Sequence, residues 1–346
     1  MNPAMTARPH VSVVMLAYGS EPWLGEAVRA ALASTRIDVD LILVDNGCTT
    51  DSVSRLDGLA RLRVLRPESN AGYAGGCLLG AQQATGEYLA FVNSDAVVEP
   101  DALAKLVAVA AESGVGLAMA SVRLADEPEV MNTAGNPWHV AGLSWAGGFG
   151  QPASRYSQRR PVPVGSGCCF VVRRDRWQKV GGFAEEFFAY HEDTDLSVRV
   201  WQRGWSVEYV PDARVAHHYE FSRNELKLQL LERNRLVLLL TTYQPRTLLL
   251  LAPVLALTEL AMLAAATAGG WLPAKLRGWA WLWRHRSWLR ERHRAIQRAR
   301  KVGDRDLAHL MTARFDPANV AAPPGVRVYN ALVSGWWVLV RGLLPR

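Results

Sequence analysis

Two acidic motifs and one histidine pair hold the residue types in this sequence that could do chemistry. Asn93-Ser94-Asp95 follows an apolar run at residues 88–92, and His191-Glu192-Asp193-Thr194-Asp195 comes about a hundred residues later. The pair His217-His218 lies after both motifs. One carboxylate could hold a divalent cation while another accepts a proton. That division of labour suits the transfer of a sugar from a nucleoside diphosphate.

Asp95 is predicted to bind a metal, because both oxygens of an ionised carboxylate are electron-pair donors. At a strand end such a group suits Mg²⁺ or Mn²⁺. Either His217 or His218 could add a nitrogen ligand, which would shift the preference toward Mn²⁺. A capping aspartate with two surface histidines is the alternative, since Asp often closes turns. The neighbouring motifs favour the metal site.

Glu192 and Asp193 begin a helical pattern at residues 193–203. Carboxylates in a first helical turn often serve only as caps, and the helix dipole lowers their pKa. An aromatic wall would instead desolvate a carboxylate and raise its pKa toward the value that a general base needs. The aromatic residues that precede the pair are Phe187, Phe188 and Tyr190. They favour a catalytic carboxylate over a cap.

Short β-rich runs alternate with helical stretches from residue 10 to about 125, which predicts a parallel α/β sheet. Residues 127–161 lack a clear period and are predicted to form an ordered loop or lid, or a partly mobile insertion. The predicted strands are 11–16, 41–44, 62–65, 88–92, 167–173 and 206–210, and the predicted helices are 23–33, 75–85, 100–113, 193–203 and 225–242.

Polar residues follow three of the predicted strands. Ligands bind beyond the carboxyl ends of strands in open parallel sheets, so these residues are candidates for a nucleotide site, although Asp and Asn also close turns. The glycine-rich segment 70–76 precedes a predicted helix, where free amides could approach a diphosphate. A flexible connector is an equally good interpretation of that segment. The strand-end residues are Ala17-Tyr18-Gly19-Ser20, Asp45-Asn46-Gly47 and Asn93-Ser94-Asp95.

The length of 346 residues, 49% of them hydrophobic, allows one large domain with an appendage or two domains. The first ten residues show no charged start followed by an apolar run. No secretory signal is therefore expected, and the catalytic part is expected in the cytoplasm. Four cysteines without CxxC spacing predict buried thiols rather than a disulfide framework or a zinc site.

Positive charge gathers at the C-terminal end of the chain. Residues 271–346 contain 15 Lys and Arg against 4 Asp and Glu, a net charge of +11, which leaves −4 of the total of +7 for residues 1–270. Seven of the 13 tryptophans lie in the same region. Basic residues beside tryptophan suit a lipid headgroup layer, and nucleic acid is the competing partner. The apolar stretch immediately upstream favours the membrane surface.

That stretch, residues 248–268, is long and apolar enough to cross a bilayer, which takes about 20 residues. It contains Pro253 and Glu259, and both of its flanks are basic. A single crossing would leave one basic flank outside, against the positive-inside tendency. A re-entrant or surface-lying helical hairpin is therefore predicted, with a buried soluble helix pair as the alternative. Residues 331–344 are a predicted second interfacial contact.

Six motifs follow one another over roughly residues 10–245. They are VSVVMLAYGS, LILVDNGCTTD, NAGYAGG, EYLAFVNSDAVVEPDAL, GSGCCFVVRRDRW and GGFAEEFFAYHEDTDLSVRVWQRGW. In this order they resemble the family-2 glycosyltransferases with the GT-A fold. Within that family the chain looks most like bacterial rhamnosyltransferases and galactofuranosyltransferases that extend cell-wall polysaccharides or lipid-linked glycans.

The resemblance implies an α/β fold of the GT-A type, in which helices flank a Rossmann-like, mostly parallel sheet. The basic, tryptophan-rich composition after this region adds the expectation of a C-terminal helical region that associates with membranes. The expected divisions are a disordered N-terminus at 1–9, a nucleotide-sugar glycosyltransferase domain at 10–224, and a basic, tryptophan-rich helical region at 225–346.

The resemblance further implies roles for single residues. Asp193 matches the catalytic base, and Asp95 and His217 match ligands of a divalent metal, Mg²⁺ or Mn²⁺. Asn93 stands where many relatives have a first acid, and Gly19 stands where Asn is more usual. The nucleotide sugar is expected to contact Ala17, Tyr18, Asp45, Asn70, Gly72, Tyr73, Asn93, Ser94, Asp95 and Glu192.

These expectations predict an inverting glycosyltransferase on the cytoplasmic face of the cell membrane, in a peripheral, monotopic or re-entrant arrangement. The favoured donor is dTDP-rhamnose or a UDP-sugar, and the favoured acceptor is a lipid-linked glycan or polysaccharide of the cell envelope. A nucleotidyltransferase that makes nucleotide sugars is the first alternative, and the Glu192-Asp193 pair argues against it. A catalytically silent membrane scaffold is the second, although Asp95 and Asp193 are both present. The sequence indicates no oligomeric state.

Overall fold

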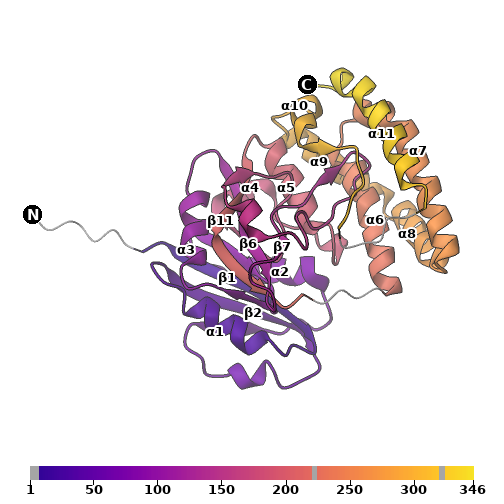
Figure 1. Cartoon of the computed structure of the whole chain (residues 1–346). Coiled ribbons are helices and arrows are strands. Elements are labelled where there is room, and N and C mark those ends of the chain that lie inside the picture. The colour runs from indigo at the N-terminus through magenta and orange to yellow at the C-terminus, as the bar shows by residue number, and fades with distance from the viewer. Residues whose placement is uncertain (1–7, 220–223, 319–323) are drawn as a thin grey trace, which may run out of the picture.

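The body of the protein is a mixed sheet with helices on both faces (Figure 1). The computed structural model describes residues 8–219, 224–318 and 324–346, so residues 1–7 of the predicted disordered N-terminus lie outside the described residues. The main sheet follows the order β3-β2-β1-β4-β10-β6-β11-β5. The strands are β1 His10–Gly19, β2 Asp38–Cys48, β3 Leu62–Leu65, β4 Tyr88–Val92, β5 Ala96–Val98, β6 Val115–Leu124, β7 Met131–Thr133, β8 Trp138–His139, β9 Arg160–Pro161, β10 Cys169–Arg173, β11 Ser206–His217 and β12 Met311–Thr312.

Strands β3, β2, β1 and β4 run parallel, as their alternation with helices predicted. β10 runs antiparallel to both β4 and β6, which makes the sheet mixed. β1 is buried almost throughout, because a central strand with helices over both faces needs apolar residues on each side. The helices are α1 Leu24–Leu32, α2 Gly72–Gln82, α3 Ala102–Ala110, α4 Arg174–Val180, α5 Glu192–Gln202, α6 Glu225–Thr242, α7 Pro245–Ala268, α8 Leu272–Arg284, α9 Arg286–Ala299, α10 Asp304–Leu307 and α11 Val326–Val340.

Two strands differ most from the sequence prediction. The strand expected at 206–210 continues to His217 as β11, because a bulge between Val210 and Arg214 accommodates Pro211. β6 was not predicted as a strand, since only two of its ten residues, Val115 and Val122, are β-branched. Its pairing with β11 and β10 supplies the stability that its own sequence does not indicate.

Residues 127–161 form an ordered segment that contains β7, β8 and β9, which confirms the ordered-loop alternative. Met131 and Trp138 within it are fully buried. The thiols are free, and those of Cys77, Cys168 and Cys169 are buried, as the cysteine spacing predicted. Cys48 is only half-buried.

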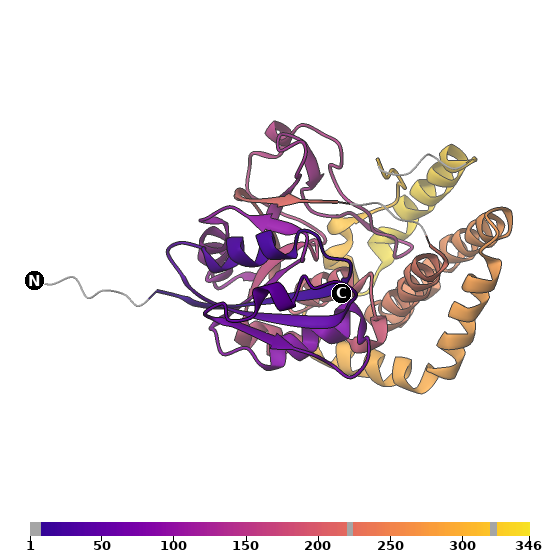
Figure 2. The same cartoon turned by 90° about the horizontal axis from the view of Figure 1, so that it is seen from below.

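The helices after residue 225 pack against the sheet body. Val237 of α6 and Leu289 of α9 belong to the same apolar cluster as Phe91 and Phe170 of the sheet. Seen from below, the chain runs out along α7 and returns to the body along α8 and α9 (Figure 2). The C-terminal helices therefore share a core with the sheet, and the domain boundary at residue 224 stays a prediction.

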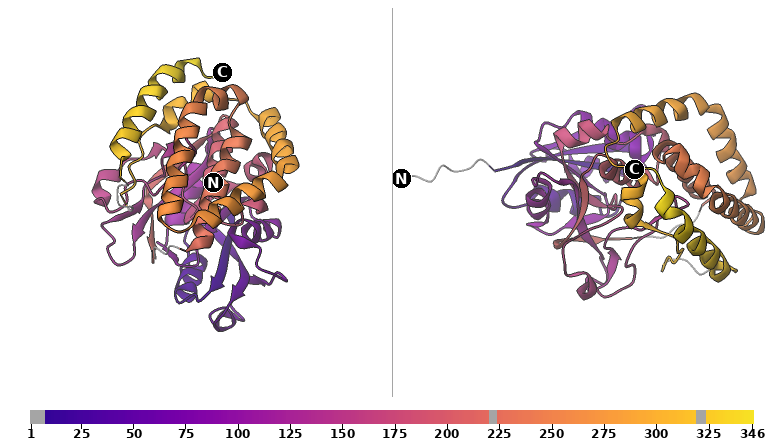
Figure 3. Two further views of the ribbon diagram at one scale, coloured as in Figure 1. Left: turned by 90° about the vertical axis from the view of Figure 1, so that its right-hand side faces the viewer. Right: turned by 90° about the horizontal axis from the view of Figure 1, so that it is seen from above.

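Helix α7 is long and apolar enough to cross a membrane by length and composition, with a mean hydropathy of 2.2. Only 17% of its most apolar window is buried, so most of α7 faces outward. It stands at the outer side of the helical layer with α11 beside it (Figures 1 and 3). This exposure is not that of a buried soluble helix pair.

Candidate active site

A cavity of about 690 Å³ opens where β4 and β11 end and β10 begins, beside the start of α5. Polar side chains from several parts of the sequence line it, and they include Asp193 and His217 of the predicted catalytic and metal-binding residues. Its other wall comes from α6, Phe315 and Pro317, and it is apolar except for Lys227. Polar residues that line the cavity include Tyr73, Asn93, Asn132, Thr133, Asn136, Glu192, Asp193 and His217.

Asp193 lies in the first turn of α5 and is partly buried at the cavity wall. Its Oδ2 accepts from the Gly167 amide at 3.0 Å, and its Oδ1 accepts from the Thr194 amide at 2.6 Å. The Thr194 hydroxyl also donates to Oδ1 at 3.1 Å. Burial raises the pKa of the Asp193 carboxyl, while these donors stabilise its ionised form. The carboxylate is thus held as a proton acceptor.

Glu192 directly precedes Asp193 and is also buried. It is 7% exposed, and its Oε2 is buried without a hydrogen-bond partner. Burial, followed by the charge of Asp193, raises the pKa of the Glu192 carboxyl to about 8. The two neighbouring carboxyls therefore differ in their surroundings: hydrogen-bond donors stabilise the ionised form of Asp193, whereas burial favours the protonated form of Glu192.

The predicted aromatic wall contributes less than expected. Tyr190 lines the cavity, but Phe187 is 1% exposed inside the apolar core and Phe188 packs against Gly72. The wall prediction was therefore wrong for Phe187 and Phe188. The carboxyls are desolvated mainly by their position at the buried start of α5.

Asp95 and His217 meet across the cavity edge, with His217 Nε2 3.1 Å from Asp95 Oδ1. His217 Nδ1 lies 3.1 Å from Asn132 Oδ1, which can only accept, so Nδ1 carries the hydrogen. His217 Nε2 then faces the Asp95 carboxylate, an arrangement that suits a cation held between the two groups. His218 instead stacks on Trp23 at 3.6 Å between ring centroids, which favours His217 over His218.

The side chains of Asp95 and His217 fit a divalent metal that completes its coordination with a substrate diphosphate. Asn93 Oδ1 is a further buried acceptor without a partner beside Asp95. Among the residues that the structure describes, three or more His, Cys, Asp or Glu side chains nowhere gather into a metal-binding group. Ligands from a substrate would therefore have to complete the coordination of any metal held here.

The strand ends of β1 and β2 come together as predicted. Ala17 lies opposite Asp45 in the parallel ladder, and the Tyr18 side chain is 57% exposed beside Gly47. Ala17 is fully buried, backbone included, so its predicted contact with the nucleotide sugar would require a neighbouring group to move. Asp45 Oδ1 accepts from the Cys48 amide at 3.0 Å, as the turn interpretation expected, while Oδ2 is 3.4 Å from Arg66 Nε.

The glycine-rich segment is tied into the protein. The amides of Ala71 and Gly72 donate to the side chains of Asn46 and Asn70. Gly72 has a φ of +70°, and a Cβ there would lie 2.4 Å from the Phe188 carbonyl oxygen, so glycine is required. Helix α2 consequently begins at Gly72 rather than at residue 75. The assignment of Asn70, Gly72, Tyr73 and Ser94 to a nucleotide sugar stays a prediction.

Sequence reasoning missed three residues that shape the site. Asn132 orients His217 from β7, and Glu21 accepts from the Tyr18 amide at 3.0 Å. Asn234 of α6 bonds the loop before Glu192. Neither Asn132, followed by Thr133, nor Asn234, between Arg233 and Arg235, is distinguished by its sequence neighbours, and its partner comes from a distant segment.

The raised pKa of Glu192 predicts a pH-dependent stability. A carboxyl whose pKa is raised on folding contributes fully below its unfolded value near 4.5, and this contribution is lost as the pH rises through about 8. Between pH 5 and pH 9, wild type should lose roughly 2–4 kcal/mol more unfolding free energy than Glu192→Gln, at about 1.4 kcal/mol per pKa unit. Urea denaturation across this range tests it, and parallel curves for the two proteins would refute it.

Two family models and a curated relative match the part of the chain that forms the sheet body. The glycosyl transferase family 2 sequence model matches residues 12–181, and that of the N-terminal domain of galactosyltransferase matches residues 150–223. An N-acetylglucosaminyl-diphospho-decaprenol L-rhamnosyltransferase from Mycobacterium tuberculosis is 28% identical over 230 residues, covering 60% of this chain and 75% of that protein.

Two solved structures share the fold. A structure of GalNAc-T7 with UDP, GalNAc and Mn²⁺ has a TM-score of 0.57 at 17% identity, over 67% of this chain and about half (48%) of that one. A mannosyltransferase from Pyrobaculum calidifontis, in complex with GDP-Man and Mn²⁺, has a TM-score of 0.52 at 20% identity, over 85% of this chain and 86% of that one. The chain therefore carries a glycosyltransferase family 2 domain at residues 12–181, built on a GT-A fold.

Proposed function

We propose that this protein is an inverting glycosyltransferase that moves a sugar from a nucleoside diphosphate to an acceptor hydroxyl. The observation that carries the proposal is the placement of Asp193. Its carboxylate is held by three donors on the wall of a cavity that Asn93 and His217 also line. A proton acceptor and a diphosphate site around one cavity are the two parts that direct displacement needs.

In this mechanism Asp193 accepts the proton of the acceptor hydroxyl as its oxygen attacks the anomeric carbon. The new C–O bond forms while the bond to the diphosphate breaks, and attack from the opposite face inverts the anomeric configuration. Asp95 and His217 would hold a divalent cation, Mg²⁺ or Mn²⁺, which would offset the charge that develops on the leaving diphosphate. Tyr18 and Asp45 hold the nucleoside at the strand ends.

The names and ligands of the relatives indicate which donor and acceptor to test first. The mycobacterial rhamnosyltransferase named above acts on a decaprenyl diphosphate, and the two solved structures contain UDP or GDP-Man with Mn²⁺. We favour dTDP-rhamnose or a UDP-sugar as donor and a lipid-linked glycan of the cell envelope as acceptor. The apolar wall formed by Leu228, Leu231 and Phe315 suits an acceptor that carries a lipid.

Nucleotide release from a panel of dTDP-, UDP- and GDP-sugars, with and without Mn²⁺ or Mg²⁺, tests the proposal. One donor should release its nucleotide in a metal-dependent way. Asp95→Ala and His217→Ala should each lower this release by about 10²-fold, because each removes a ligand of the cation. The proposal would be contradicted if no donor in the panel released its nucleotide. Pyrophosphate release from a nucleoside triphosphate and a sugar phosphate would also contradict it, and would favour a nucleotidyltransferase.

We also propose that α7, α8 and α11 lie on the cytoplasmic surface of the membrane without crossing it. α7 contacts both α8 and α11 on the outer side of the molecule (Figure 3). Glu259 of α7 is turned inward, where it pairs with Arg235 and Lys275. A helix that presents its carboxylate to the protein and its apolar side outward suits one leaflet. Exposed apolar residues on these helices include Leu249, Leu260, Trp283, Val328, Val338 and Leu339.

The triple variant Leu249→Gln, Trp283→Gln, Leu339→Gln should lose most of its binding to anionic phosphatidylglycerol vesicles, because each change removes an exposed apolar contact. Vesicle flotation measures this binding, and Leu79→Gln on α2 is the matched control for an exposed leucine. Unchanged flotation of the triple variant would contradict the proposed surface. Truncation at residue 246 is unsuitable as a test, because it removes Leu289 from the core shared with the sheet.

A further inference from the structure

The loop that leads into α5 has an unusual backbone. Phe188, Tyr190 and His191 have φ angles of +63°, +69° and +68°, in a region that side-chain-bearing residues rarely adopt. Such conformations persist only where surrounding groups hold them, and they concentrate at functional sites. Glu192 and Asp193 follow directly, so the path of this loop determines where the Asp193 carboxylate lies.

Asn234 of α6 holds the loop from one side. It is fully buried, and its Nδ2 lies 2.9, 2.8 and 2.7 Å from the carbonyl oxygens of Phe187, Ala189 and Tyr190. Its Oδ1 accepts from Arg233 Nε at 2.9 Å. Every polar atom of the side chain is therefore engaged, and all its donor capacity goes to the loop.

Arg233 extends the same attachment. Its Nη2 donates to the carbonyls of Glu186 and Phe187, both at 2.8 Å. Its guanidinium also lies 4.5 Å from the ring centroid of Trp281 on α8. Arg233 is thus enclosed between the loop and a helix of the proposed membrane face, a contact typical of cation–π pairs.

Helix α2 closes the loop from the opposite side. The Ala74 amide donates to the Phe188 carbonyl at 2.9 Å, and Gly72 leaves the space that this carbonyl needs. The loop is consequently bonded by the glycine-rich segment on one side and by α6 on the other. The two attachments together explain how three of the four residues 188–191 keep a positive φ.

We infer that Asn234 and Arg233 are positioning residues, which fix the loop at 186–191 and thereby place Asp193 for proton transfer. This inference rests on the proposed function, because it assumes that Asp193 is the base. Neither residue lines the cavity, so neither is expected to contact the donor. Their loss should lower kcat while leaving the donor KM and the affinity for UDP with Mn²⁺ within about two-fold.

Asn234→Ala in the full chain is the principal test. kcat for nucleotide release should fall by roughly 100-fold, the cost expected for a misplacement of about 1 Å. Hydrogen exchange at the amides of Phe188, Ala189 and Asp195, which bond within this loop and the first turn of α5, should accelerate by at least about ten-fold. Leu238→Ala, one turn further along α6 and equally buried, is the control for lost stability. It should leave kcat and the exchange of the loop unchanged.

Exchange of the loop at the wild-type rate, or a kcat that falls no further than in Leu238→Ala, would overturn the inference. If Asn234→Ala does not fold, Arg233→Lys carries the same test, since lysine keeps the charge but loses the planar fork that reaches two carbonyls. Asp193→Asn is measured in parallel. Full activity of Asp193→Asn would refute the proposed base, whereas loss of its activity beside a fully active Asn234→Ala would refute the positioning role alone.

Discussion

Asp193→Asn is expected to lower kcat for sugar transfer by about 10³-fold at neutral pH, within the range that a positioned general base contributes. The amide has nearly the same shape, but it cannot take the proton of the acceptor hydroxyl. Binding of UDP with Mn²⁺ should change by less than about two-fold, because Asp95, His217 and Asp45 lie on other elements. Steady-state transfer rates and calorimetric UDP binding measure the two effects separately.

Asp175→Asn provides the matched control, since this carboxylate lies on α4 and pairs with Arg173 and Lys179 away from the cavity. It should retain the wild-type kcat. Asp193→Asn with more than about a tenth of the wild-type kcat would contradict the base assignment. A loss of UDP affinity equal to the loss of kcat would instead indicate that Asp193 holds the donor.

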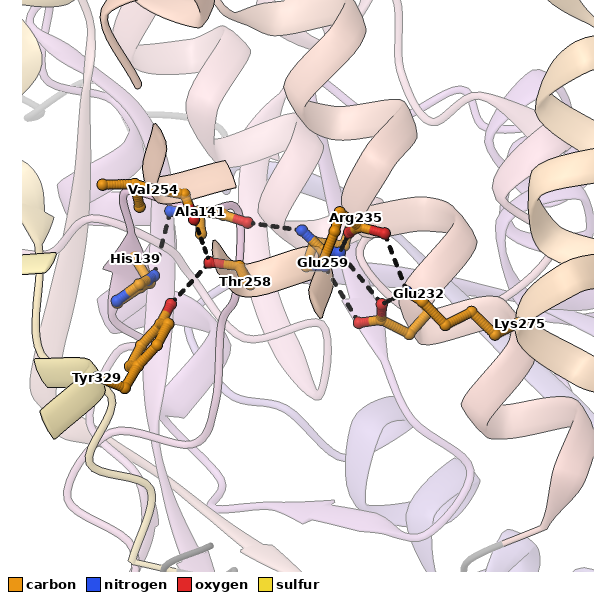
Figure 4. A network of polar contacts seen from close by, with 9 residues as sticks. All are labelled: His139, Ala141, Glu232, Arg235, Val254, Thr258, Glu259, Lys275 and Tyr329. Atoms are coloured by element: carbon orange, nitrogen blue, oxygen red, sulfur yellow. Dashed lines mark hydrogen bonds and ion pairs between the residues drawn. The ribbon is translucent and has the colours of Figure 1, made fainter. Parts of the chain in front are cut away.

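Arg235→Met is expected to lower the free energy of unfolding by about 3–5 kcal/mol, because removing one partner from a buried ion network leaves charge uncompensated. Arg235 and Lys275 are each 1% exposed and share the carboxylates of Glu232 and Glu259 (Figure 4). Burial alone would raise the pKa of Glu232, but the two cations outweigh it and lower the pKa to about 2. The two cations and two anions balance as a set, which a single replacement disrupts.

Urea denaturation monitored by circular dichroism measures the change, with Arg246→Met on the exposed start of α7 as control. The control should change the unfolding free energy by less than about 0.5 kcal/mol, as surface substitutions usually do. Arg235→Met within about 1 kcal/mol of wild type would show that the network does not hold α7 and α8 on α6. Figure 4 also shows Thr258 of α7 bonding Tyr329, a second attachment that this variant leaves in place.

The sequence predicted strands β1 to β4 and their parallel arrangement, because these strands are local units that alternate with helices. It could not choose between His217 and His218. That choice depends on the bulge in β11, which sets the face toward which each histidine points, and on the pairing of β11 with β5 and β6. The environment of Asp193 was partly predictable, since its place in a first helical turn follows from the local pattern.

Contacts between distant segments account for what the sequence did not indicate. Gly72 suggested a diphosphate cradle, and the structure gives it a steric reason that involves Phe188, more than a hundred residues away. Asn234 lies in a helix that was predicted correctly, but its partners are carbonyls of another loop. Glu259 was a puzzling charge in an apolar stretch until Arg235 and Lys275 were placed beside it.

The most direct test of the central claim is the mass of the acceptor. Polyprenyl-diphosphate glycans from a bacterial lipid extract, incubated with the donor that the panel identifies, should gain the mass of one sugar in the presence of wild type and metal. Asp193→Asn should leave the acceptor unchanged, and the new linkage should have the anomeric configuration opposite to that of the donor. Donor consumption at equal rates by both proteins, with no gain in acceptor mass, would contradict the account.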